Sequence, residues 1–334
     1  MTKTREKIAV IGSNSFSGSS FVAYCLSLGV EILGISRSSE TADVFLPYKW
    51  NINRSGVFRF EKLDLNHDTD KIADSIEKFR PDCVVNFAAQ GMVAQSWEHP
   101  DHWYETNVIG NVKLHDKIRN FSFLKKYVHI STPEVYGNCT GKVTELMPFN
   151  PSTPYATSRA ACDLHLRTFF NRYKFPVVFT RAANVYGPGQ QLYRIIPRTI
   201  FYIKLGKKLK LDGGGHSVRS FIHIRDVATA TLKIAQKGIA GEAYHISTDS
   251  YISIRALVEL ICRMMKADFA KAVEIVDDRP GKDAAYLLDS SKLRTELGWA
   301  DHIGLEDGIC ETMGWVNDNF AELKKQPSEY IHKK

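Results

Sequence analysis

Short apolar segments alternate with helical patterns through about the first 185 residues of this 334-residue chain. Apolar strands that alternate with helices are typical of parallel sheets, because the crossover helices cover both faces of the sheet. The pattern therefore predicts an α/β fold with a Rossmann-type doubly wound parallel sheet. The expected strands are residues 7–12, 30–35, 57–64, 83–87, 127–130 and 177–180.

The rhythm of the sequence changes after residue 188, where basic helical segments and a run of three glycines replace the alternation. This change predicts a dinucleotide-binding domain of residues 1–188, with later segments at roughly 220–248 crossing back into it. Residues 189–330 are then expected to form mainly a smaller C-terminal substrate-binding lobe.

Composition excludes several classes of protein. The chain is 44% hydrophobic and 24% charged, which is ordinary for a globular protein. No run approaches the roughly 18 apolar residues of a membrane span, and no signal peptide precedes the first strand. Six scattered cysteines lack metal-ligand spacing and are typical of reduced thiols, so we expect a cytoplasmic protein without a bound metal. The net charge of +7 forms no single stripe, which favours an anionic small molecule over nucleic acid.

A glycine-containing loop joins the first strand to the helix that follows it. Small residues let the backbone approach a pyrophosphate, and a helix N-terminus offers free N–H groups and a positive dipole end. Ser15 stands where the usual fingerprint has its middle glycine, and a plain tight turn is the alternative interpretation. The loop predicts a dinucleotide site that includes Gly12, Ser15, Phe16, Ser17 and Gly18.

The end of the second strand bears on which dinucleotide binds. Ser36 and Arg37 lie where an acidic residue would hold the ribose of NAD. Because this pair better suits a 2′-phosphate, the sequence favours NADP over NAD; the alternative is that Arg37 is a solvated loop arginine. Asp64 and Leu65, after the third strand, are expected near the adenine edge.

Candidate catalytic side chains follow the fifth strand. Thr132 and Glu134 lie at the edge where open α/β sheets bind ligands. Tyr155 and Arg159 are four residues apart, so they share one face of a helix. A cation beside a phenol favours the phenolate, and we expect Arg159 to lower the pKa of Tyr155 toward the working pH. Tyr155 would then act as a base, with Thr132 binding the same substrate hydroxyl and Glu134 serving a second proton transfer.

Motifs along nearly the whole chain resemble the extended short-chain dehydrogenase/reductase superfamily. The resemblance is greatest to its nucleotide-sugar 4,6-dehydratases of the dTDP-glucose and GDP-mannose types. The motifs are Asn86-Phe-Ala-Ala-Gln90, Thr106-Asn107, Ser131-Thr-x-Glu134, the helix of Tyr155, Arg181-x-x-Asn-Val-Tyr-Gly-Pro188, residues 217–226, residues 278–283, Tyr286, Asp289 and Glu296-Leu-Gly-Trp299.

The resemblance implies a reaction on a nucleotide-diphosphate hexose with a tightly bound, recycled cofactor. Tyr155 would deprotonate the sugar O4 as hydride leaves C4, and Glu134 would remove the C5 proton as water leaves C6. Return of hydride to C6 gives a 4-keto-6-deoxy sugar. The resemblance also implies a homodimer formed through helices around residues 108–119 and 155–173. It implies cofactor contacts from Ala88, Ala89, Asn107, Tyr155 and Arg159, and substrate contacts from Gln90, Ser96, Asn184, Arg219 and Arg279.

Three positions depart from the family pattern. Pro133 occupies the place of the acid that protonates the leaving hydroxyl in the dTDP-glucose enzymes, and Arg159 replaces the usual lysine. Ser15 in the phosphate loop is the third departure. Two alternatives therefore stay open: a nucleotide-sugar epimerase acting at C4 or C5, and a catalytically silent dinucleotide sensor or scaffold.

Overall fold

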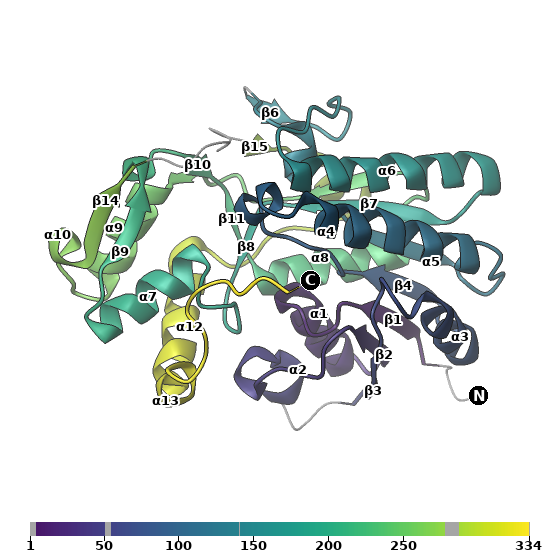
Figure 1. The fold of residues 1–334 in the computed structure, drawn as a ribbon, viewed down its shortest axis with the longest axis horizontal. Coiled ribbons are helices and arrows are strands. Elements are labelled where there is room, and N and C mark those ends of the chain that lie inside the picture. Colours follow the sequence, from purple (N-terminus) through teal and green to yellow (C-terminus); the bar gives the residue numbers. More distant parts are fainter. Residues whose placement is uncertain (1–4, 51–54, 140, 278–286, 334) are drawn as a thin grey trace.

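The computed structural model describes residues 5–50, 55–139, 141–277 and 287–333, and its centre is a seven-stranded parallel sheet (Figure 1). The strand order is β12-β7-β5-β4-β1-β2-β3. The predicted Rossmann-type doubly wound sheet is confirmed. The strands are β1 Lys7–Ile11, β2 Glu31–Ser36, β3 Val57–Lys62, β4 Cys83–Asn86, β5 Lys126–Ile130, β7 Val177–Ala182 and β12 Ala243–Ile246.

Helices bury both faces of this sheet, and β1 shows how. Successive side chains of a strand point to opposite faces. Ile8 and Val10 pack into the core under α1 and α8, whereas Ala9 and Ile11 pack into the core under α3, α5 and α6. Because both faces are covered, β1 is apolar from Ile8 to Ile11, whereas the edge strand β3 alternates with charged residues and is partly exposed. The covering helices are α1 Phe16–Ser27, α3 Thr69–Phe79, α5 Asn111–Ile118, α6 Pro154–Tyr173 and α8 Ile224–Lys237.

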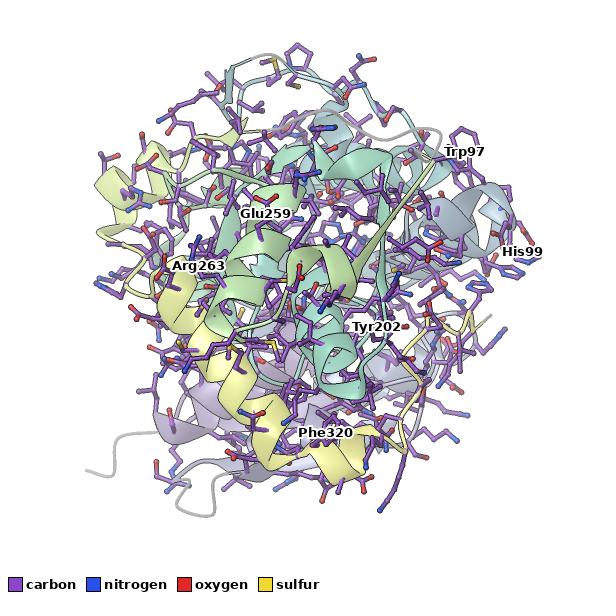
Figure 2. The ribbon with its side chains drawn as sticks, turned by 90° about the vertical axis from the view of Figure 1, so that its left-hand side faces the viewer. Trp97, His99, Tyr202, Glu259, Arg263 and Phe320 are labelled. Carbon is purple, nitrogen blue, oxygen red and sulfur yellow. The ribbon has the colours of Figure 1, made fainter. Side chains whose placement is uncertain are left out.

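A smaller lobe lies beside the sheet, on the left in Figure 1. Its apolar core joins three helices, with Ile196, Leu257 and Ile309 among the buried side chains. Figure 2 looks onto the outer face of this lobe, where Glu259 and Arg263 lie on α9. The elements of the lobe are α7 Ile195–Leu205, β9 Leu209–Asp212, α9 Ile254–Met264, α10 Phe269–Ala272, β14 Val273–Val276, α12 Leu305–Asp318 and α13 Phe320–Leu323.

Short strand pairs connect the lobe to the sheet domain. β8 (Asn184–Tyr186) pairs in parallel with β11 (Phe221–His223), and β10 (Val218–Arg219) pairs antiparallel with β13 (Ile252–Ser253). A third pair, β6 with β15, lies above α6 in Figure 1. The remaining strands and helices are α2 Pro47–Trp50, α4 Pro100–Tyr104, β6 Lys142–Val143, β15 Leu287–Leu288 and α11 Ser291–Leu297.

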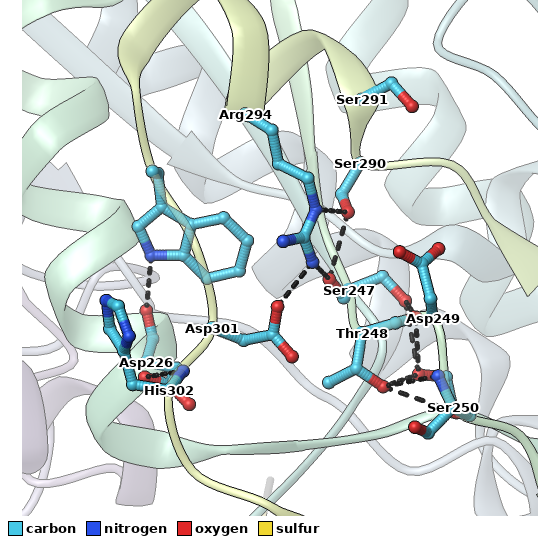
Figure 3. A network of polar contacts seen from close by, with 12 residues as sticks. Asp226, Ser247, Thr248, Asp249, Ser250, Ser290, Ser291, Arg294, Asp301 and His302 are labelled. Atoms are coloured by element: carbon cyan, nitrogen blue, oxygen red, sulfur yellow. Dashed lines mark hydrogen bonds and ion pairs between the residues drawn. The ribbon is translucent and has the colours of Figure 1, made fainter.

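Two residues of the sequence motifs, Asp226 and Trp299, contact each other, and Figure 3 shows the polar contacts around Asp226 and Arg294. The Trp299 indole N–H donates to the Asp226 carbonyl over 3.2 Å, and the Asp226 carboxylate accepts the backbone N–H of Ile303 over 3.0 Å. Arg294 donates to the carbonyl of Ser247, just beyond β12, over 3.0 Å. These motif residues therefore fasten the last part of the chain to α8 and β12.

The seventh strand, β12, lies in the segment at 220–248 that was expected to cross back into the first domain, and it pairs with β7. The boundary at residue 188 remains a prediction. All six cysteines are free thiols. No helix in the described part of the chain is long and apolar enough to span a bilayer.

Candidate active site

The loop between β1 and α1 is packed too closely for side chains at two of its glycines. Gly12 has a φ of +82°, and a Cβ there would lie 2.7 Å from the backbone nitrogen of Ala88. A Cβ on Gly18 would lie 2.2 Å from the Gly12 carbonyl oxygen. Both positions therefore require glycine, because the backbone of the loop lies directly against neighbouring backbone.

Ser15 replaces the middle glycine of the fingerprint and caps α1. Its hydroxyl donates to the Gly12 carbonyl over 2.7 Å and accepts the Gly18 N–H over 3.1 Å. The N–H groups of Phe16 and Ser17 lie in the first helical turn, where no intrahelical acceptor exists, and this turn carries no acidic residue. The loop thus fits a pyrophosphate at a helix N-terminus.

The end of β2 is tied to the same loop. Ser36 is buried, and its hydroxyl accepts the backbone N–H of Asn14 over 3.0 Å. Arg37, the next residue, donates to the carbonyl of Lys333 over 3.3 Å. Asp64 lies after β3, where its carboxylate accepts the Asn66 N–H over 2.8 Å. The Leu65 side chain is buried in the sheet core, and the expected position of Asp64 and Leu65 near the adenine edge stays a prediction.

The segment after β4 brings Ala88 against the phosphate loop at Gly12, and Ala89 and Gln90 follow it in the chain. Asn107 holds Gln90 in place: it accepts the Gln90 N–H over 2.9 Å and donates to the Gln90 carbonyl over 3.1 Å. Asn107 has no exposed surface, because the π-helical turn Glu105–Gly110 directs it inward. The predicted cofactor contact of Asn107 is therefore corrected to a supporting role.

Three predicted catalytic side chains converge at the carboxyl end of β5. Thr132 and Glu134 follow the strand, and the Thr132 hydroxyl donates to the Glu134 carboxylate. Tyr155 enters from the first turn of α6, which begins at this point because Thr153 caps it and Pro154 occupies its first position. Tyr155 is 9% exposed, so most of its side chain is packed against neighbouring residues.

The charge of Arg159 lowers the pKa of Tyr155, as expected, but the net shift of that pKa is upward. Burial raises the pKa of Tyr155 above its ordinary value, and the Glu134 carboxylate raises it further. The charge of Arg159 and a hydrogen bond with Thr132 act the other way but do not prevail. Without a bound cofactor the phenol is therefore protonated at neutral pH.

Arg159 is almost wholly buried, and its predicted contact with the nicotinamide ribose stays a prediction. The side chain is 2% exposed, and the guanidinium donates to the carbonyl of Ile130 at the end of β5. Its Nη2 also lies 3.4 Å from Nε2 of His129. Burial and nearby arginine charges lower the pKa of His129 well below its ordinary value, so this imidazole is neutral. Arg159 thus supports the catalytic segment from behind.

A buried carboxylate joins these elements. Asp163, one turn beyond Arg159 on α6, accepts hydrogen bonds of 2.7 Å from both the Ser131 hydroxyl and the Arg181 guanidinium. Neither Asp163 nor Arg181 has any exposed surface. The pair therefore fixes β5, β7 and α6 relative to one another behind the catalytic residues.

The residues predicted to bind the substrate differ in their surroundings in the structure. Ser96 has no exposed surface and donates to the Val93 carbonyl over 2.6 Å, so its predicted substrate contact is corrected to a structural bond. Asn184 begins β8, and Arg219 ends β10 with a hydrogen bond to the carbonyl of Val218. Arg279 lies outside the described residues.

Arg194, which lies immediately before α7, was not among the residues predicted from the sequence. Its positive charge is close enough to Tyr155 to lower the pKa of that phenol. An arginine beside the phenol of Tyr155, the predicted base, suits the anionic part of a nucleotide sugar. Its position six residues after the Asn-Val-Tyr-Gly-Pro motif was the available signal.

Comparisons with known proteins agree with this arrangement. The family model described as GDP-mannose 4,6 dehydratase matches residues 10–312. This chain belongs to that family. A dTDP-glucose 4,6-dehydratase of Xanthomonas campestris pv. campestris is 31% identical, and the match covers 93% of each chain.

Solved structures extend the likeness to three dimensions. The dTDP-glucose 4,6-dehydratase DesIV of Streptomyces venezuelae, with NAD and TYD bound, has a TM-score of 0.86 and 30% identity, covering 95% of this chain and 98% of its own. A UDP-glucose 4-epimerase of Thermotoga maritima has a TM-score of 0.85 and 26% identity, covering 94% and 99%. The predicted function, a nucleotide-sugar 4,6-dehydratase that uses a nicotinamide dinucleotide, is confirmed at the level of the family.

Proposed function

We propose that this protein eliminates water from a dTDP-activated hexose and forms the 4-keto-6-deoxy sugar. The observation that carries the proposal is the convergence of Thr132, Glu134 and Tyr155 at the end of β5, beside a loop that fits a pyrophosphate. The family relationship supports the reaction, and the dTDP-glucose enzymes among the relatives support the choice of base and sugar.

Each catalytic residue has a role that follows from its chemistry. Tyr155 accepts the proton of the sugar O4, and Thr132 orients that hydroxyl by hydrogen bonding. A nicotinamide dinucleotide bound at the β1–α1 loop would supply the hydride chemistry, which is oxidation at C4 and reduction at C6. A ketone at C4 acidifies the C5–H bond, and Glu134 removes that proton. Arg194 holds the diphosphate by charge-assisted hydrogen bonds.

Pro133 leaves Glu134 with both proton transfers of the elimination. The side chain of Pro133 has no proton to give, and it is buried between Thr132 and Glu134. Glu134 therefore takes the proton from C5 and passes it to the hydroxyl that departs from C6, so that water leaves and the carboxylate is regenerated. One residue can serve both steps because the two carbons are adjacent.

NAD is the proposed cofactor, in place of the predicted preference for NADP. The Streptomyces venezuelae enzyme was solved with NAD, which supports this choice. Calorimetric titration of the protein with each dinucleotide tests it directly. Arg37→Ala should leave the affinity for NAD within a factor of about three, whereas a 2′-phosphate site would lose NADP binding selectively.

A homodimer is also proposed. Apolar side chains lie exposed on neighbouring elements of one region: Tyr104 at 38%, Ile109 at 43% and Leu164 at 54%. Ile109 and Leu164 lie within the two helical stretches that the family resemblance assigns to the subunit interface. Burial of such side chains against a second copy would remove them from water.

The decisive experiment incubates the protein separately with dTDP-glucose, GDP-mannose, UDP-N-acetylglucosamine and CDP-glucose, followed by mass spectrometry. Loss of one water from dTDP-glucose alone is the expected result. A substrate that keeps its mass but changes its NMR spectrum would identify an epimerase, the second candidate that Pro133 favours. If all four sugars are unchanged in mass and spectrum, the dehydratase proposal fails for these donors.

Two variants assign the roles. Glu134→Gln should oxidise the sugar and then stall, so that the reduced nicotinamide accumulates and its absorbance rises. Tyr155→Phe should abolish the first step, and no reduced nicotinamide should appear. The opposite pattern would exchange the two roles and overturn the assignment.

A further inference from the structure

The chain beyond α13 returns from the small lobe to the carboxyl edge of the sheet, where Figure 1 marks its end close to α1 and α4. We call residues 327–333 the C-terminal segment. Its first anchor is on α7: the Glu329 carboxylate accepts a hydrogen bond from Arg198 and one of 2.7 Å from the Tyr202 hydroxyl. Tyr330 then packs edge-on against Tyr193, with ring centroids 5.4 Å apart.

The second anchor is a stack of rings beside the cleft. The His332 imidazole lies nearly parallel to His102 and Trp103, with centroids at 5.1 and 5.2 Å and interplanar angles of 8° and 9°. His99 stacks at 5.6 Å. Nε2 of His332 lies 2.8 Å from Nδ1 of His102, and its Nδ1 lies 3.2 Å from the Tyr330 hydroxyl. Both nitrogens of the His332 ring therefore have hydrogen-bond partners, and these partners fix the position of the ring.

The third anchor is the backbone carbonyl of Lys333. It accepts a 2.7 Å hydrogen bond from the Gln90 side chain and a 3.3 Å hydrogen bond from Arg37. Gln90 follows β4 and Arg37 follows β2, and β1 lies between those strands in the sheet. A group held by both side chains therefore lies across the end of β1, where the phosphate loop begins at Gly12.

The segment also passes close to the cations of the site. The positive charges of Arg37 and Arg194 both act on the Tyr330 phenol, although burial is the larger influence and raises its pKa. Arg194 likewise acts on Tyr155. The segment therefore extends from the neighbourhood of the catalytic phenol to the end of β2, which is the path that a dinucleotide would follow in a Rossmann-type site.

We propose that residues 327–333 are an intramolecular ligand of the dinucleotide site, and that the cofactor must displace them to bind. The segment offers chemistry that a dinucleotide also offers: a planar heteroaromatic ring in the His102–Trp103 slot, and an oxygen acceptor for Gln90 and Arg37. It lacks a pyrophosphate for the N-terminus of α1, so the cofactor has the stronger contacts. Only molecules in which the segment is undocked can bind the cofactor. The apparent Kd for the cofactor is therefore the intrinsic Kd divided by the fraction of undocked molecules.

The test measures NAD binding by calorimetry in the absence of any sugar, after removal of copurified dinucleotide. Three proteins are compared with the full chain: a chain that ends at Gln326, His332→Ala and Ile331→Ala. The truncated chain and His332→Ala should bind NAD roughly tenfold more tightly, which corresponds to a segment docked about nine-tenths of the time. Ile331 is 62% exposed, so Ile331→Ala serves as the matched control and should bind as the full chain does.

Unchanged or weaker NAD binding by both altered chains would overturn the proposal, because the segment would then be a bystander or a part of the cofactor site. Truncation removes the Glu329 and Tyr330 anchors and could unfold the small lobe. His332→Ala retains both anchors, so its result does not depend on that loss. A complementary measurement is tryptic cleavage after Lys325, which saturating NAD should accelerate as the segment is released. Since no sugar is present, these results do not depend on the dehydratase reaction.

Discussion

The Ser131 hydroxyl donates a 2.7 Å hydrogen bond to Oδ2 of Asp163, and this contact joins the catalytic loop to α6. The same carboxylate oxygen accepts Arg181 over 2.7 Å. Thr132 is adjacent to Ser131, and Tyr155 lies two turns before Asp163 on the helix. The relative position of the two catalytic segments therefore depends on a carboxylate that is itself fully buried.

Asp163→Asn should lower the free energy of unfolding by about 3 kcal/mol, because it leaves the buried Arg181 charge without its counterion. Urea denaturation followed by circular dichroism measures the change. Asp116→Asn is the matched control: that carboxylate is 60% exposed, and its pairing with Arg119 is worth only about 0.5 kcal/mol. Equal effects of the two substitutions would contradict a structural role for Asp163.

Glu134→Gln should lower the pKa of Tyr155, because the Glu134 carboxylate contributes to its elevation. Arg159→Met should raise the same pKa, since the arginine charge opposes that elevation. Ultraviolet titration of the cofactor-free protein reports phenolate formation, and subtraction of the Tyr155→Phe curve isolates the one tyrosine. Shifts in the same direction for both variants would refute the electrostatic assignment.

Stability should fall as the pH decreases below about 6.5. Burial lowers the pKa of His245 to about 3 and that of His223 to about 4, whereas both titrate near 6.5 in the unfolded chain. Between these values the unfolded state binds more protons, so acid favours unfolding, by up to about 1.4 kcal/mol per pH unit for each histidine. His245→Gln should reduce the slope measured by urea denaturation, and an unaltered slope would exclude His245 as its source.

Arg194→Ala should raise the KM for the nucleotide sugar about tenfold with a smaller effect on kcat, because a charge-assisted contact to the diphosphate is lost. Steady-state kinetics with dTDP-glucose measures both constants. Lys204→Ala, on the far end of α7, is the control and should leave KM unchanged. A fall in kcat at constant KM would instead assign Arg194 to the chemical step.

Leu164→Glu should convert the proposed dimer to a monomer at micromolar concentration, because it places a charge among exposed apolar side chains. Size-exclusion chromatography with light scattering gives the mass. Leu146→Glu is the control, since Leu146 is 91% exposed and lies in a loop outside that region. A wild-type protein that is already monomeric would remove the basis of this proposal.

The sheet could be predicted because its strands are short, apolar and bounded by helices, as β1 and β4 illustrate. The phosphate loop and the residues after β5 could be predicted because their place follows from that order. The pairing of β6 with β15 could not, since two-residue strands carry no periodicity.

Side-chain direction limited the prediction of the site. Asn107 lies in a π-helical turn that directs it inward, and sequence spacing does not reveal such a turn. Arg159 shares the helix face of Tyr155 as expected, but spacing does not reveal that its guanidinium donates to the Ile130 carbonyl. The segment around His332 has no hydrophobic pattern, and its contacts depend on rings more than two hundred residues earlier in the chain.

The position of β12 in the sheet determines whether the first domain can be produced alone. β12 follows α7 and β9 of the small lobe in sequence, yet it covers the outer edge of β7 and completes the sheet. A fragment that stops near residue 188 would expose the N–H and C=O groups of β7 along a strand whose residues are almost wholly buried. Such an open edge invites pairing between chains, so the isolated first domain is expected to aggregate, and the two lobes must be produced as one polypeptide.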